Sequence, residues 1–270
     1  MKIKWLKIIG LGFLCILVGA LLYLARRKEN VRPITNPNIL VHVDGGDALL
    51  NEQELNDRLL KNHLYTLASP FSALDIKKIE AFVCQMEEVK KARVYKKLGG
   101  TWCIEVWLRK PIARIFTKDG SSWYLDNEGN VISVTQLHAA KLLVISGEFN
   151  EPLKGEKVHD IINNDSLKNI RKLDDCYLIS NYVCNDSLLK PLISQVYLDS
   201  TGEFVLIPLL GDQKIIFGSA LSRSQVEDKF KRLKVFYKEG IAFEGWKKYS
   251  EINVKYDGQI VCRKREFGPK

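Results

Sequence analysis

The sequence predicts an α+β protein: a single N-terminal transmembrane helix, a small β-α-α-β-β domain, and a mainly antiparallel β domain with flanking helices. Three observations lead to this fold class. An uncharged apolar run occupies residues 8–24. Residues 39–110 contain strand patterns before and after two helix patterns, and closely spaced strand patterns fill residues 111–263. A chain of 270 residues is long enough for two modest domains beside such a helix.

The apolar run at residues 8–24 is long enough to cross the core of a bilayer. At about 1.5 Å per residue it spans roughly 26 Å, and Trp5 and Tyr23 lie where interfacial aromatic residues are expected. The alternative is a cleavable signal peptide, but no Ala-x-Ala site follows the run, and Leu14 stands where a lipoprotein needs a small residue before Cys15. We therefore predict an uncleaved anchor that contacts the lipid bilayer through residues 8–24.

The formal net charge of +9 invites a nucleic-acid-binding interpretation, which its distribution opposes. Six of the 41 basic residues flank the apolar run and precede the first acidic residue, Glu29, so the rest is nearly balanced by 32 acidic residues. Nucleic-acid binders carry their basic residues on a folded face instead. We predict no nucleic-acid partner. The basic residues on the two sides of the run are also too evenly divided to set its orientation.

A short linker with two prolines, residues 25–38, precedes the first domain. Asn51 can cap a helix with Glu54 at its third position, and Asp75 can begin a second helix. Gly99 and Gly100 can form the turn of a hairpin. The expected strands are residues 39–43, 89–98 and 101–109, and the expected order is β-α-α-β-β.

The stretch from Arg109 to Val131 joins the two domains. Pro111 cannot donate to a strand ladder, so we expect the preceding strand to end there or to lie at an edge. Trp123 and Leu125 then alternate with polar positions of a strand, and residues 126–129 have turn chemistry. On this pattern alone, the stretch is a junction between two small domains.

The second domain contains further strand patterns and two expected helices. A helix is expected within residues 161–176, and another from residue 223 to 238 with Val226, Phe230, Leu233 and Tyr237 as its apolar stripe. A basic face outside that stripe is more often solvated than bound to an acidic partner. Its expected members are Lys229, Lys231, Arg232 and Lys234, and the expected strands are residues 141–146, 194–198, 204–209, 214–217 and 251–261.

These features together resemble the bacterial cell-division family FtsQ/DivIB. The β-α-α-β-β order resembles a POTRA domain, and the succession of Phe217-Gly218, a basic helix and a final strand resembles the end of the FtsQ β domain. This chain has Asn253 and Lys255 where the family usually has an Asp and an Arg. The seam between the two domains resembles the family pattern at Pro111, Ala113, Trp123, Leu125, Asp126, Gly129 and Val131.

The resemblance implies a bitopic scaffold of the cell inner membrane that belongs to the division machinery, with FtsB-like and FtsL-like bitopic proteins as partners. It also implies a cytoplasmic N-terminus and periplasmic C-terminal domains. A different class, a POTRA-containing component of protein export or outer-membrane assembly, stays open, although such proteins usually carry several POTRA repeats or a membrane barrel. The implied parts are a short cytoplasmic segment at 1–7, the membrane helix at 8–24, the linker at 25–38, a POTRA-like domain at 39–110, an FtsQ-type β domain at 111–263 and a basic tail at 264–270.

We find no constellation for catalysis, a metal or a cofactor, and we expect neither an enzyme nor a small-molecule substrate. The four histidines, His42, His63, His138 and His159, are scattered. The paired carboxylates Asp174/Asp175 and Asp126/Glu128 are expected to be solvated turn residues, and Ser180 and Ser194 lack a recognisable base. Among the cysteines, pairs 176/184 and 84/103 are conceivable disulfides, but buried free thiols are favoured.

Partner binding is expected at the last strand, because little chain remains to cover its far edge. An exposed edge offers backbone N–H and C=O groups to a visiting strand. The alternative is an ordinary edge protected by Lys255 and Asp257. The expected partner-binding residues are Tyr249, Ile252, Val254, Tyr256 and Val261.

Overall fold

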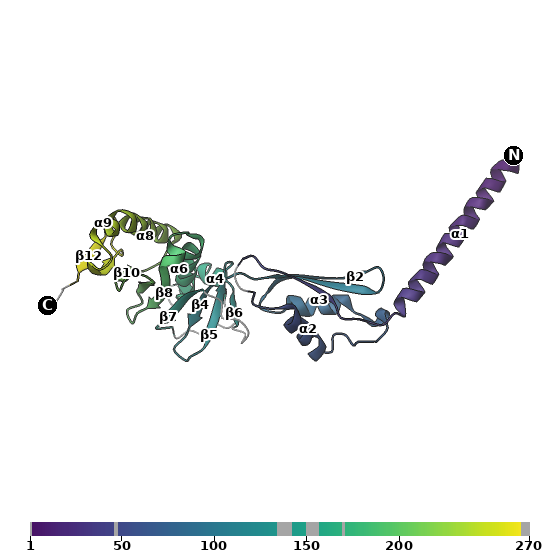
Figure 1. Cartoon of the computed structure of the whole chain (residues 1–270), viewed down its shortest axis with the longest axis horizontal. Helices are drawn as coiled ribbons and strands as arrows, with labels where there is room; N and C mark the ends of the chain where they lie inside the picture. Colours follow the sequence, from purple (N-terminus) through teal and green to yellow (C-terminus); the bar gives the residue numbers. More distant parts are fainter. Residues whose placement is uncertain (1, 46–47, 134–141, 150–156, 169–170, 266–270) are drawn as a thin grey trace. The chain divides into compact units, whose positions relative to one another are not determined.

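The computed structural model describes residues 2–45, 48–133, 142–149, 157–168 and 171–265 (Figure 1). Contacts between Cα atoms divide the chain into two compact units. The first contains residues 1–44 and 48–108, and the second contains residues 45–47 and 109–270. The predicted positions His138 and Lys141 lie outside the described residues.

The chain begins with helix α1, Lys2–Asn30. Residues 25–30, which we predicted as linker, are therefore helical. In the described part of the chain, no helix is both long and apolar enough to cross a membrane. The prediction of a membrane-spanning helix at residues 8–24 is thus unconfirmed.

The first unit has the predicted β-α-α-β-β order. Asn51 caps its first helix by accepting a hydrogen bond from the backbone of Glu54 at 2.8 Å, and Asp75 caps the next through Lys78 N at 3.1 Å. The two helices and the core lie against a three-stranded sheet of order β1-β3-β2, in which only the β1–β3 pair is parallel. Its elements are β1 (Asn38–His42), α2 (Glu52–Lys61), η1 (Phe71–Ala73), α3 (Ile76–Cys84), β2 (Val89–Lys97) and β3 (Thr101–Leu108).

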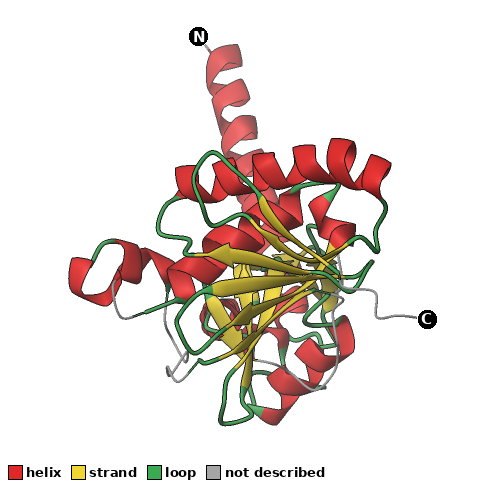
Figure 2. Cartoon of the chain, turned by 90° about the vertical axis from the view of Figure 1, so that its left-hand side faces the viewer, coloured by secondary structure: helices red, strands yellow, loops and turns green. Residues whose placement is uncertain are grey.

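The second unit is built on one nine-stranded sheet of order β12-β11-β10-β9-β8-β7-β4-β5-β6. Figure 2 draws its strands in yellow and the helices in red. The strands are β4 (Pro111–Phe116), β5 (Ser122–Asp126), β6 (Val131–Ser133), β7 (Leu143–Gly147), β8 (Ile193–Leu198), β9 (Phe204–Pro208), β10 (Lys214–Gly218), β11 (Tyr249–Asn253) and β12 (Val261–Lys264).

Helices pack on the apolar face of this sheet. Ile179 of α6 and Phe230 of α8 share a core with Ile115, Val196 and Phe217 of the strands, and all five side chains are fully buried. The helical segments are α4 (Val158–Ile162), α5 (Asp165–Lys168), α6 (Leu173–Asn185), α7 (Leu189–Leu192), α8 (Arg223–Val235), the π-helical turn η2 (Phe236–Ile241) and α9 (Ala242–Glu244).

The pairing is mainly antiparallel, as predicted, but the centre of the sheet is not. The β4–β7, β7–β8 and β10–β11 pairs are parallel. The strand before Pro111, β3, ends at Leu108, as predicted, and Pro111 is the first residue of β4, which lies between β7 and β5. Proline is tolerated at the first residue of a strand, because the ladder there can begin with the next residue.

Two predictions about the second unit are wrong. The helix expected within residues 161–176 is divided, because Asn164 Oδ1 accepts from Ser166 N at 3.1 Å and starts a separate turn, and the long helix α6 begins only at Leu173. The last strand, expected at residues 251–261 with a turn or bulge at Gly258, is two strands, β11 and β12, joined by a turn in which Gly258 has φ +73°.

Candidate docking edge

Strand β12 forms one end of the nine-stranded sheet. Among the described residues it pairs only with β11, in an antiparallel register that sets Ile252 opposite Cys262. Arg265 N donates to Lys248 O at 2.9 Å, so residue 265 turns its backbone groups toward β11. Because backbone direction alternates along an antiparallel strand, the N–H and C=O groups of Cys262 and Lys264 face the open side. The open edge is therefore β12, one strand beyond the predicted one.

The predicted partner-binding residues divide into buried and exposed groups. Ile252 and Val254 are fully buried in the core, so the prediction that they offer side-chain pockets to a partner is wrong. Tyr249 is half-buried against the ring of Phe236, with ring centroids 5.8 Å apart. Tyr256 and Val261 are 46% and 47% exposed. Of the five predicted residues, these last two present the most exposed apolar side chains beside the open edge.

The turn between β11 and β12 is held by Arg232 of helix α8. Its Nη1 atom donates to the carbonyl oxygens of Tyr256 and of Gln259, the latter at 2.7 Å, and Nη2 donates to Val254 O at 3.3 Å. The prediction that Arg232 belongs to a solvated basic face is therefore wrong, because its guanidinium binds the backbone of the turn. The edge strand is thus mounted on a rigid support.

Lys229, one helical turn before Arg232, is also used inside the protein. It is 1% exposed, and its Nζ atom donates to Phe217 O at 3.0 Å and to Ser219 O at 2.7 Å. Burial lowers the pKa of this amine. The prediction that Lys229 lies outside the apolar stripe is wrong, because the alkyl stem packs in the core while the amine binds carbonyl groups at the end of β10.

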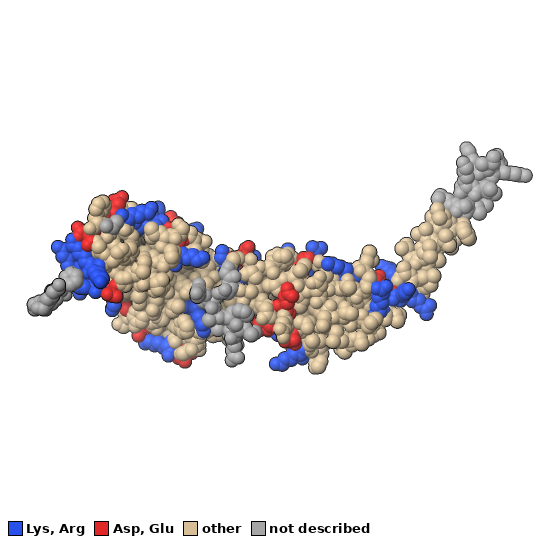
Figure 3. Space-filling view, viewed as in Figure 1, with Lys and Arg blue, Asp and Glu red and all other residues tan. Residues whose placement is uncertain are grey.

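Basic side chains gather where β12 lies (Figure 3). Lys255, predicted to protect the edge, forms an ion pair with Glu203 at 3.2 Å, and its backbone N–H donates to Asn253 Oδ1 at 3.1 Å. On β12 itself the Arg263 side chain is largely exposed and forms only a long ion pair with Glu251, at 3.9 Å. The open edge therefore carries positive charge and suits a partner strand with acidic residues.

At the seam, Asp126 is fully buried and not a solvated turn residue as predicted. Its carboxylate accepts hydrogen bonds from Arg109 Nη1 at 3.0 Å, from the backbone of Glu128 at 2.9 Å, and from the backbone of Asn130 at 2.7 Å. This one side chain closes the β5–β6 turn and ties it to the start of the second unit. The turn motif is therefore structural.

Asp174 and Asp175 begin helix α6 and are both 3% exposed, so the prediction that they are solvated is wrong as well. Burial raises the pKa of Asp175 to about 6, although Lys172 Nζ lies 3.3 Å from its Oδ2 atom and favours the charged form. The neighbouring carboxylate of Asp174 raises this pKa further, and the more distant Lys229 lowers it. Desolvation is the larger effect.

This arrangement predicts a pH dependence of stability. In an unfolded chain an aspartate titrates near pH ~4, so the folded state binds the proton of Asp175 more tightly. The stabilising contribution of the protonated form is complete below about pH 4 and is lost as the pH rises through about 6. We expect Asp175→Asn to remove this loss and to raise the free energy of unfolding at pH 7 by about 1–3 kcal/mol.

Denaturant titrations at pH 4, 5, 6 and 7 check this prediction, with Asp228→Asn, whose side chain is 65% exposed, as the control. Parallel pH profiles for the wild type and Asp175→Asn would contradict it.

The described residues bring none of the predicted chemistry-bearing groups together. His42 stacks on Trp107 with ring centroids 4.9 Å apart, and Ser194 Oγ donates to Ile207 O at 2.9 Å. Within the described ranges, no group of three or more His, Cys, Asp or Glu side chains could hold a metal ion. No disulfide joins the six cysteines, all of which the structure describes, and Cys176 and Cys184 lie on the same helix, about 12 Å apart along its axis.

Sequence reasoning missed the roles of Lys229 and Arg232 and the separate strand β12. The two basic residues carry no local signal, because their carbonyl partners lie on other elements. Gly258 did signal a turn, but the residues after it continued an apolar pattern.

Comparisons with known proteins agree with this architecture. The family described as "FtsQ/DivIB, C-terminal related" matches residues 110–263, more than half of the chain, and a POTRA-like domain matches residues 38–107. None of the curated proteins matches the chain significantly.

Proposed function

The chain belongs to the FtsQ/DivIB C-terminal-related family, and from this premise we propose that it is a non-enzymatic scaffold of the bacterial cell-division machinery. The observation that carries the proposal is the order of two matched domains on one chain, a POTRA-like domain followed directly by the FtsQ/DivIB-related domain. If the protein were a POTRA-containing component of protein export or outer-membrane assembly, only the POTRA-like match would be explained. The second match therefore favours the division scaffold.

The scaffold recruits FtsB-like and FtsL-like bitopic proteins through its extracytoplasmic domains, and β12 is the docking strand. Support comes from the open backbone groups of Cys262 and Lys264 and from the exposed side chains of Tyr256 and Val261. A partner strand gains affinity from main-chain hydrogen bonds and specificity from alternate side chains. Arg232 keeps the edge in place, so little conformational entropy is lost on binding.

A proline at position 262 tests this docking strand. The N–H of Cys262 faces the open side, so Cys262→Pro removes a donor needed by a partner strand but no hydrogen bond to β11. We expect co-purification of the FtsB-like partner to fall about tenfold or more, because the donor is lost and the proline ring also obstructs the approach of a partner strand. Co-purification from membranes measures this, with Cys262→Ala as the matched control.

Circular dichroism verifies that Cys262→Pro is folded, and Tyr256→Asp tests the adjoining surface without any change in the backbone. If both folded variants retain the FtsB-like partner at the wild-type level, β12 is not the docking strand. The scaffold role itself is tested separately, by whether cells that lack the protein fail to divide.

The N-terminal helix is proposed to anchor the protein in the cell inner membrane, with the N-terminus in the cytoplasm and the two units in the periplasm. Support comes from the family resemblance and from the exposed apolar side chains of α1: Phe13, Ile16 and Leu22 are 69%, 71% and 64% exposed. Apolar side chains exposed along one helix are suited to lipid contact.

We expect the mature chain to retain this helix. Intact mass of the membrane-extracted protein measures it, and carbonate extraction provides the control for membrane integration. A mature chain that begins between residues 21 and 30 would show that the segment is a cleaved signal peptide.

A further inference from the structure

A second exposed apolar surface lies at the end of the sheet where β4, β7 and β8 begin. Leu209, Leu210 and Trp246 are 68%, 58% and 42% exposed there. Two hollows flank the leucines, one of about 580 Å³ and one of about 290 Å³, and Pro191 of α7 lines both. Exposed leucines and a tryptophan beside preformed hollows are typical of a protein-binding surface and not of a solvated face.

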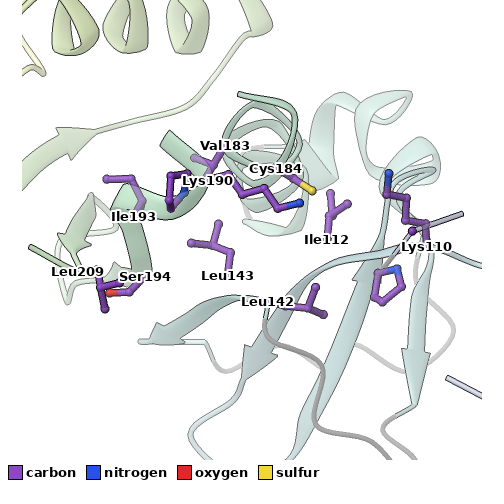
Figure 4. A pocket seen from close by; sticks show the side chains of 13 residues that line it. Lys110, Ile112, Leu142, Leu143, Val183, Cys184, Lys190, Ile193, Ser194 and Leu209 are labelled. Carbon is purple, nitrogen blue, oxygen red and sulfur yellow. The ribbon is translucent and has the colours of Figure 1, made fainter. Parts of the chain in front are cut away.

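The larger hollow is an apolar recess with lysines at its rim. Ile112, Leu143 and Ile193 form part of its wall at the starts of β4, β7 and β8. Figure 4 shows the Lys190 side chain pointing toward Cys184, while Lys110 lines the hollow at a separate place, directly before β4. Two separate cations suit a ligand with at least two carboxylates.

The smaller hollow adjoins the larger one at Pro191, which lines both. Leu210, Tyr237 and Trp246 line it, with Lys238 at its rim. The ridge between the hollows is fixed, because Leu209 N donates to Leu192 O at 2.7 Å and ties the end of β9 to α7. The surface is therefore largely preformed.

Charge decides what this surface can bind. Lys110, Lys190 and Lys238 line the two hollows, whereas none of the aspartates and glutamates that the structure describes lines either. Among the described residues, none of these lysines has an ion pair with a carboxylate. A second copy of the chain would bring lysines against lysines in a symmetric contact, which is unfavourable. The complementary ligand is acidic between its apolar side chains.

We propose that this surface, defined by Lys110, Cys184, Lys190, Leu209, Leu210 and Trp246, binds an acidic, apolar segment of a partner polypeptide. Apolar side chains of the segment enter the two hollows, and its carboxylates pair with the rim lysines. The surface is separate from the β12 edge, since it is built on the starts of β4, β7 and β8 and on α7. It gives the scaffold a second site of engagement, independent of strand pairing.

The test uses the full chain in nanodiscs of zwitterionic lipid and the fluorescein-labelled peptide amide Asp-Leu-Glu-Phe-Asp-Leu-Glu. Fluorescence anisotropy measures binding, and two control peptides replace either the acidic residues by lysine or the apolar residues by serine. We expect only the acidic, apolar peptide to bind. Lys110→Glu combined with Lys190→Glu is expected to weaken binding about tenfold or more, and Lys231→Glu, on helix α8, to leave it unchanged.

A second measurement uses Cys184 as a reporter, because its half-buried thiol lines the larger hollow. In a variant with Cys15, Cys84 and Cys262 replaced by serine, the acidic peptide is expected to slow alkylation of Cys184 by about fivefold. Leu210→Ser is expected to abolish this protection while leaving the melting temperature unchanged, because its side chain is 58% exposed.

Three outcomes would overturn the proposal. In the first outcome, the lysine peptide binds as tightly as the acidic peptide, or Lys110→Glu combined with Lys190→Glu leaves binding of the acidic peptide unchanged. Vesicles of anionic lipid bind the chain and displace the peptide completely, which would assign the surface to a membrane. The chain dimerises at micromolar concentration, and Leu210→Ser abolishes both dimerisation and peptide binding, which would assign it to a second copy.

Discussion

Lys229→Ala is expected to lower the free energy of unfolding of the second unit by about 3–5 kcal/mol. The substitution removes a buried alkyl stem and leaves Phe217 O and Ser219 O without the amine that now lies 3.0 Å and 2.7 Å away. Each buried carbonyl left without a donor costs about 1–3 kcal/mol, and the cavity adds to this. The size of the effect reflects the position of Lys229, between helix α8 and the end of β10.

Denaturant unfolding followed by circular dichroism measures this effect, and the transition of the first unit serves as an internal reference. Lys231→Ala is the matched control on the same helix, because the Lys231 side chain is 62% exposed. Lys229→Met keeps most of the volume and separates the two contributions: its loss should be about half as large, since only the hydrogen bonds disappear. Equal stability of Lys229→Ala and Lys231→Ala would refute the assigned role.

The same substitution should weaken binding at β12 without touching a partner. Lys229 and Arg232 lie on one side of α8, and Arg232 holds the turn that leads into β12. When α8 packs less tightly against β10, the edge strand becomes more mobile. A partner must then order this strand on binding, and the lost conformational entropy lowers the affinity. Partner co-purification should fall in proportion to stability, unlike in Cys262→Pro, where binding falls while stability is kept.

The first unit was predicted closely because its signals are local. Asn51 and Asp75 cap helices through hydrogen bonds within three residues, and the Gly99-Gly100 turn joins neighbouring strands. A sequence displays such signals in full. The resulting order of elements then sufficed to indicate a POTRA-like domain.

The second unit was predicted less well because its organisation depends on distant pairing. The parallel pairs β4–β7 and β7–β8 join segments whose connections contain the strands β5 and β6 or the helices α4 to α7, and periodicity does not reveal strand order. Buried charges were missed for a related reason. Asp126 and Lys229 are expected to be solvated from the sequence alone. Only the fold supplies the hydrogen-bond partners that offset the free-energy cost of burying their charges.

The candidate docking edge shows both limits at once. The alternation of apolar residues correctly predicted a strand at Ile252, whose side chain is fully buried. This alternation shows which face of the strand is buried, but it does not show which strand pairs with its edge. The turn at Gly258 folds the last residues back, and β12 takes the outer place. Tyr256 and Val261, two of the predicted partner-binding residues, are exposed because they flank that turn.

Gly147→Ala is expected to destabilise the second unit by about 3–5 kcal/mol. Gly147 ends β7 opposite Leu198 of β8, and its φ is +120°, where side chains are strongly disfavoured. A Cβ atom there would lie 2.1 Å from Leu198 O, which is a backbone atom and cannot rotate away. The two central parallel strands would have to separate, which disturbs the hydrogen bonds of both.

Gly120→Ala provides the matched control, since Gly120 also has a positive φ, +85°, but open space where its Cβ would be. Its expected loss is about 1 kcal/mol, from backbone strain alone. Denaturant titration of both variants separates the close contact from the strain. Because β7 and β8 also begin at the lysine-rimmed hollow, Gly147→Ala should also weaken binding of the acidic peptide. Gly120→Ala should bind the peptide as tightly as the wild type. Similar stabilities of the two variants would mean that β7 and β8 can part at position 147 without loss.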